Sequence, residues 1–118
     1  MYLSDHPASA LVEVLVHLEV DPEDVPDAYQ LLAVDVPDQI TFESVKANDL
    51  PADWAANLAK SRAIGDQWLA DNRTALLRVP SAIVPFAWNW LLNPMHADAA
   101  KAHTANVFRV PFDPRLVS

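Results

Sequence analysis

Two polar residues, Glu13 and Ser81, lie in apolar settings where they could do chemistry. Glu13 interrupts the segment LVEVLVHL at residues 11–18, and Ser81 interrupts LRVPSAIVP at residues 77–85. A carboxylate close to the apolar face of a helix is costly to bury unless a partner compensates its charge. The plain alternative for Glu13 is a solvated helix residue, because Glu is rarely found in protein interiors.

His17 follows Glu13 by four residues, so both side chains are expected on one face of a helix. His17 could therefore pair with Glu13, and a Glu-x-x-x-His pair can also supply two metal ligands. The other histidines, His6, His96 and His103, show no spacing typical of further ligands. The sequence therefore predicts no metal site.

Ser81 lies in the string VPSA, outside any Gly-x-Ser-x-Gly motif, so a hydrolase-type nucleophile is not expected. Its hydroxyl could point into a cleft from the end of a strand. The alternative is a turn serine that bonds to its own backbone. Asn89 and Asn93 are interpreted as turn residues, and the four Trp residues as core or interface bulk.

A first helix is expected to position Glu13. Ser4 or Asp5 could cap it with Pro7 in its first turn, and it is expected to end near Asp21-Pro22. Its predicted buried stripe consists of Ala10, Leu11, Val14, Leu15 and Leu18.

Two more helices are predicted in the middle of the chain. One starts after Asn48 or Asp49, with Trp54 and Leu58 on its buried side. The other follows a cap at Ser61 and covers residues 62–72, with inward-facing positions at Ile64, Trp68 and Leu69. Close packing or ligand contact would explain its Gly65, since glycine weakens a helix by about 1 kcal/mol relative to Ala.

Strands are predicted at residues 29–36, 40–45, 76–79, 83–86, 90–92 and 107–112, with one late helix at residues 98–104. Strands 76–79 and 83–86 flank Ser81. Helices that concentrate early and short strands that concentrate late, without regular alternation, favour an α+β fold. No repeat or linker divides the chain, so residues 1–118 are interpreted as one domain.

Composition excludes several classes of function. The chain has no Cys, which excludes disulfides, thiolate metal sites and a cysteine nucleophile. Its net charge of −8 opposes direct binding to nucleic acid and disfavours small anionic ligands unless a local cluster of Arg side chains or backbone N–H groups overrides it. No apolar run is long enough to span a membrane, and the N-terminus does not resemble a signal peptide, so a cytoplasmic location is expected.

Several uncommon strings occur in one order along nearly the whole chain. They are Tyr2 in a Tyr-x-Ser/Ala start, LVEVLVHL, LPADW at 50–54, SRAIGDQWL at 61–69, VPSAIVP at 79–85, NWLLNPMH at 89–96 and PFDPRL at 111–116. Together they resemble the RES domain, the toxin of RES/Xre toxin–antitoxin pairs. The resemblance implies a fold similar to ADP-ribosyltransferases, cleavage of the nicotinamide–ribose bond of NAD, and neutralisation by an Xre-type antitoxin. NAD would be a substrate, with no further cofactor.

The resemblance also implies roles for single residues. Glu13 would be the catalytic carboxylate that stabilises the positive charge on the opening ribose. Ser81 would hydrogen-bond the substrate and orient its ribose. Tyr2 would border the nicotinamide, and His17 and Asn93 would also contact substrate. Water or phosphate would then take the vacated sugar carbon.

The family's Arg-containing segment, which would precede the Tyr-x-Ser/Ala start, has no counterpart because the sequence begins at Met1-Tyr2. The resemblance is therefore to an N-terminally shortened RES domain. None of the arginines in this chain matches the family's Arg, which would clamp the pyrophosphate. A second hypothesis follows, a catalytically weak relative that binds an antitoxin or itself. An exposed sheet edge left by a missing strand would favour self-association.

Overall fold

The computed structural model describes residues 1–18 and 21–117. These residues form two α-helices, α1 (Pro7–Val16) and α2 (Leu58–Asp71). They also form six strands, β1 (Tyr2–Ser4), β2 (Ala28–Asp35), β3 (Phe42–Ser44), β4 (Leu76–Pro80), β5 (Trp88–Leu92) and β6 (His103–Pro111). Short 3₁₀ helices cover Pro22–Asp24, Ala47–Asp49, Ala97–Lys101 and Pro114–Leu116.

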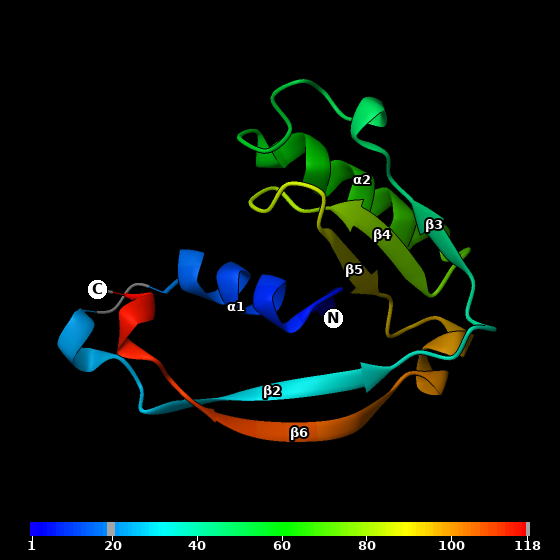
Figure 1. The fold of residues 1–118 in the computed structure, drawn as a ribbon. Helices are drawn as coiled ribbons and strands as arrows, with labels where there is room; N and C mark the ends of the chain where they lie inside the picture. The colour runs from blue at the N-terminus through cyan, green and yellow to red at the C-terminus, as the bar shows by residue number, and fades with distance from the viewer. Residues whose placement is uncertain (19–20, 118) are drawn as a thin grey trace.

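The strands make two separate sheets (Figure 1). The larger has the order β1-β5-β4-β3, in which β3 and β4 are parallel and the other neighbours antiparallel. The second is a long antiparallel ribbon of β2 and β6, with a register shift between Ala33 and Val34. In Figure 1, α2 lies beside the larger sheet and α1 lies between that sheet and the ribbon. This arrangement is α+β, as predicted.

The hydrophobic core gathers where β4 begins and β5 ends. Leu76 and Leu92 face each other across these two strands. They are packed in a cluster of buried residues with Ile40, Ala75 and Ala99. Because this cluster removes apolar surface from water, it holds the larger sheet against the segments that lead to and from the ribbon.

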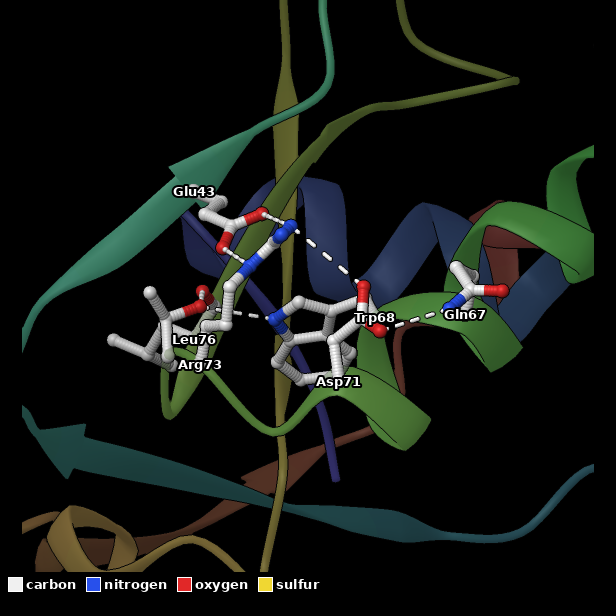
Figure 2. A network of polar contacts seen from close by, with 7 residues as sticks. Glu43, Gln67, Trp68, Asp71, Arg73 and Leu76 are labelled. Carbon is white, nitrogen blue, oxygen red and sulfur yellow. Dashed lines mark hydrogen bonds and ion pairs between the residues drawn. The ribbon is translucent and has the colours of Figure 1, made fainter.

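The turn from α2 into β4 is fixed by two sets of polar contacts (Figure 2). The buried Trp68 donates its indole N–H to the Thr74 hydroxyl over 3.0 Å, and that hydroxyl donates to the Leu76 carbonyl over 2.9 Å. On the surface, the Arg73 guanidinium forms two hydrogen bonds with the Glu43 carboxylate, at 3.0 and 3.2 Å. These contacts join helix α2, strand β4 and edge strand β3.

Helix α1 differs from its prediction at both ends and on its apolar face. His6 caps it instead of Ser4 or Asp5, because the His6 ring accepts a hydrogen bond from the Ala8 N–H. The helix ends at Val16, and residues 19–20 of the predicted helix lie outside the described residues. None of its residues is buried, because part of its apolar stripe lines an open cleft instead of a packed core.

The second predicted helix is wrong, since residues 50–57 form turns. Hydrogen bonds from the Trp54 N–H to the Pro51 carbonyl and from the Asn57 N–H to the Asp53 carbonyl close these turns. Helix α2 therefore follows Asn57 and not Ser61. Proline was a poor signal here because it suits turns as well as helix starts.

The inward face predicted for α2 is only partly correct. Trp68 is buried and Ile64 is half-buried, but Leu69 is 46% exposed. A methyl group built at Gly65 would meet no atom within 4 Å. Close packing therefore does not explain this glycine, which instead lines a cavity described below.

The predictions for the C-terminal half were right for three strands and wrong for two elements. The strands predicted at 76–79, 90–92 and 107–112 correspond to β4, β5 and β6. Residues 83–86 form a loop, in which Phe86 has a positive φ of 67° and a fully exposed side chain. The helix predicted at 98–104 is a 3₁₀ turn at Ala97–Lys101, and His103 already starts β6.

Candidate functional site

Glu13 and Ser81 meet in the structure. Glu13 projects from α1, and its Oε1 accepts a hydrogen bond of 3.1 Å from the Ser81 hydroxyl, which follows β4. The same oxygen accepts a second bond of 3.0 Å from the side-chain amide of Asn89 in β5. Among the described residues, none donates to Oε2 of Glu13. The carboxylate is thus held through one oxygen while the other remains available.

Asn89 is the buried centre of this cluster, with 1% of its surface exposed. Its Nδ2, which carries two hydrogens, donates to Glu13 and to the Tyr2 hydroxyl, the latter over 2.6 Å. Its Oδ1 accepts a 3.1 Å hydrogen bond from the Ser4 hydroxyl. Asn89 therefore ties edge strand β1 to helix α1 across the sheet.

Ser81 is held by its own loop. Its hydroxyl oxygen accepts hydrogen bonds from the Ile83 and Val84 N–H groups, at 3.2 and 3.0 Å. These bonds are the turn-serine pattern expected as an alternative, and they also explain why residues 83–86 do not form a strand. Because the two lone pairs of the hydroxyl oxygen accept these N–H groups and its one proton is donated to Glu13, its arrangement suits orientation of the carboxylate instead of nucleophilic attack.

Tyr2 lies next to the carboxylate and has an altered acidity. Partial burial and the negative charge of Glu13 raise the pKa of the Tyr2 phenol, and the hydrogen bond from Asn89 offsets part of this rise. The phenol therefore keeps its proton at neutral pH. Since its oxygen accepts from Asn89, the proton is available to another acceptor.

Two cavities adjoin this cluster. The larger, about 1460 Å³, is lined by residues of β1, α1, β2 and their neighbours, including Glu13 and the exposed His17. The smaller, about 390 Å³, lies between α2 and the larger sheet and is mainly lined by apolar residues such as Trp54, Leu77 and Leu91. Tyr2 lines both cavities. The volume of the smaller cavity falls within the usual range of small-molecule binding sites, and the volume of the larger cavity exceeds that range.

Asn93 is not at this site. It lies directly after β5, where its Nδ2 donates to Asn72 Oδ1 over 2.8 Å and its Oδ1 accepts from the Met95 N–H. Its backbone N–H donates to the Ala75 carbonyl. Asn72 ends helix α2 in the left-handed conformation, so the buried Asn93 stabilises a turn and lines neither cavity.

Asn89 and Ser4 were not predicted as members of the site. Asn89 was interpreted as a turn residue, yet it lies within β5 on the same face as its paired neighbour Ser4. A single polar residue between Trp88 and Trp90 in an alternating strand was the one available signal. Its partners could not be identified without the register of β1 on β5.

Arg78 and Arg73 interact with side chains outside the Glu13 cluster. Arg78 pairs with Trp90 on the opposite face of the sheet from Asn89, and its guanidinium lies 3.8 Å from the centre of the Trp88 ring. Arg73 is bound to Glu43. By contrast, Arg62 of α2 lines both cavities.

The described residues contain no group of three or more His, Asp or Glu side chains that could hold a metal ion. Within the same residues, neither helix has the length and apolar character needed to cross a membrane.

The sequence matches known proteins over most of its length. The sequence model of the RES domain matches residues 1–113. A Pseudomonas putida protein named Toxin Res is 41% identical over 102 residues, which cover 86% of this chain and 69% of that protein. A Sphingobium protein named Prs ADP-ribosylating toxin is 36% identical over 99% of this chain and 74% of its own length. A Toxin Res of Photorhabdus laumondii is 35% identical over 99% of this chain and 75% of its own length. The chain therefore belongs to the RES domain family.

Proposed function

We propose that this protein is a toxin-type enzyme that breaks the bond between nicotinamide and ribose in NAD. The observation that carries the proposal is the Glu13 carboxylate, which is fixed through one oxygen by Ser81 and Asn89 and lines a large cleft. The name of the Sphingobium relative agrees with this chemistry, because an enzyme that ADP-ribosylates with NAD must break the same bond. We also propose an ADP-ribosyltransferase-like fold, a cytoplasmic location and an Xre-type antitoxin as partner.

In the proposed reaction, the carbon–nitrogen bond breaks and its electron pair moves to the nicotinamide ring nitrogen, which becomes neutral. The ribose carbon is left with oxocarbenium character. The charge of Glu13 would stabilise this cation through its free Oε2, and Ser81 and Asn89 would hold the carboxylate in place. Water, phosphate or another nucleophile then bonds to that carbon and loses a proton. This is electrostatic stabilisation of a developing charge by a preorganised group.

Tyr2 and His17 are proposed to border the substrate. Tyr2 contributes a neutral phenol whose proton is available to a ribose hydroxyl or to the nicotinamide amide. His17 lies one helical turn after Glu13, at the end of α1, and lines the same cleft. Neither is needed to hold the Glu13 carboxylate, so both are assigned to substrate contact.

The test is to incubate purified protein with NAD and to measure released nicotinamide. Glu13→Gln keeps the shape of the side chain and removes its charge, so we expect nicotinamide release to fall by about 100- to 1000-fold. Glu23→Gln is the matched control, since Glu23 is exposed in the 3₁₀ helix Pro22–Asp24 and lines neither cavity. Undiminished release by Glu13→Gln would refute the catalytic role.

A second candidate function is a binding module with weak catalysis, which associates with an antitoxin or with itself. It is favoured by large exposed apolar side chains, among them Val14, Leu32 and Phe108 at 58%, 52% and 48% exposure, and by the position of β1 at the edge of the larger sheet. The NAD assay should include the 118-residue chain and an N-terminally extended form with the family's Arg-containing segment. Release of nicotinamide by the shorter form would exclude the hypothesis of a catalytically weak binding module. If neither form releases nicotinamide, the proposal of NAD cleavage is refuted.

A further inference from the structure

Arg62 occupies the junction of the two cavities. It lies in the second turn of α2, and its side chain is exposed. The residues that line both cavities are Tyr2, Leu58 and Arg62. A ligand that extends from the cleft of Glu13 into the apolar cavity under α2 would therefore lie beside Tyr2, Leu58 and Arg62.

The described part of the chain supplies no ion-pair partner for the charge of Arg62. Among the described residues, none forms a hydrogen bond or an ion pair with its guanidinium, and no other Arg or Lys lines either cavity. Asp66 follows one turn later in α2 and lines the smaller cavity without pairing to Arg62. In a chain with a net charge of −8, a single unpaired guanidinium at this junction provides a local site for an anion.

We infer that Arg62 binds the pyrophosphate of a dinucleotide, whose ends occupy the two cavities. This inference rests on the proposed function, because it uses NAD cleavage at Glu13 to orient the ligand. The scissile ribose would lie beside Glu13 and Tyr2. The distal aromatic base would enter the cavity of about 390 Å³, where Trp54 and Leu91 provide apolar surface. Guanidinium suits the bridge between these ends because it can bind two phosphate oxygens at once.

The experiment measures binding of ADP and adenosine to the 118-residue chain by calorimetry at low salt. Both probes contain the distal base, but only ADP contains the pyrophosphate. Arg62→Gln should weaken ADP binding by about 10- to 100-fold, the range for loss of a hydrogen-bonded charge pair, and should leave adenosine binding unchanged. Arg62→Lys keeps the charge without the paired donors, so its ADP affinity should lie between that of Arg62→Gln and that of the parent chain.

Lys60→Gln is the matched control. Lys60 lies two residues earlier in the same helix, is exposed and lines neither cavity. Lys60→Gln removes one positive charge, as Arg62→Gln does. Its ADP affinity should remain within about twofold of the parent, because an exposed charge at a distance is screened by salt. Thermal unfolding of each variant checks that the fold is retained.

Several outcomes separate this inference from the proposed function. Equal ADP affinity in Arg62→Gln and the parent chain would overturn the inference even if NAD is cleaved. Equal weakening of ADP and adenosine, or equal effects of Lys60→Gln and Arg62→Gln, would also overturn it. If ADP binding depends on Arg62 while no form of the protein cleaves NAD, the pyrophosphate site stands and the proposed reaction fails. No ADP binding by the parent chain would refute the site.

Discussion

Asn89→Ala should be among the most damaging single changes to the candidate site. The substitution removes three side-chain hydrogen bonds, to Glu13, Tyr2 and Ser4. A hydrogen bond to a charged group contributes about 1.5–3 kcal/mol and a neutral one about 1 kcal/mol. Since Glu13 and Ser4 are only half-buried and Tyr2 is exposed, water can replace part of this. We expect the free energy of unfolding to fall by about 2–4 kcal/mol.

Urea denaturation at neutral pH, followed by tryptophan fluorescence and circular dichroism, measures this loss. Gln67→Ala is a suitable control, because Gln67 also donates a side-chain hydrogen bond, to Asp71, but is exposed in a helix that tolerates Ala. The control should change stability by less than about 0.5 kcal/mol. A loss below about 1 kcal/mol in Asn89→Ala would refute the view that this buried amide holds β1 and α1 together.

Two further predictions concern acidity and helix stability. Because Glu13 raises the pKa of Tyr2 and Asn89 lowers it, Glu13→Gln should lower that pKa and Asn89→Ala should raise it further, as measured by titrating the ¹³Cζ resonance of labelled tyrosine. The raised pKa in the folded state means that the stabilising contribution of Tyr2 is complete below pH of about 10 and is lost as pH rises through the folded pKa. A higher Tyr2 pKa in Glu13→Gln or a lower one in Asn89→Ala would contradict this account. Gly65→Ala should increase the free energy of unfolding by about 0.5–1 kcal/mol, since alanine favours helix and its methyl group meets open space. If urea denaturation instead gave a lower free energy of unfolding for Gly65→Ala, the space beside α2 would have to be filled.

Local patterns predicted the parts of the fold that depend on nearby residues. Strand β4 was predicted closely, because its apolar run is bounded by turn residues. The face of α1 was not, because an apolar stripe shows which side avoids water in isolation but not whether another element packs against it. The backbone around Ser81 and Pro51 was mispredicted for a related reason, since serine and proline each favour more than one backbone conformation.

The candidate site was predicted in its outer members and missed at its centre. Glu13 and Ser81 were predicted as site residues from their apolar surroundings and from the sequence segments that resemble the RES domain. Asn89 had no such local mark, because its role depends on the register that places it opposite Ser4. Asn93 lies away from this cluster, and its buried amide belongs to a turn, as its local pattern indicated.

The separation of the contacts along the chain has a consequence for biosynthesis. Ser81 and Asn89 are 68 and 76 residues later in the sequence than Glu13, the carboxylate that they hold. A nascent polypeptide that has only its first half outside the ribosome therefore contains the carboxylate without its donors. The complete Glu13 cluster can form only after β5 has been made and has paired with β1. Translation itself thus delays assembly of the site until most of the protein exists.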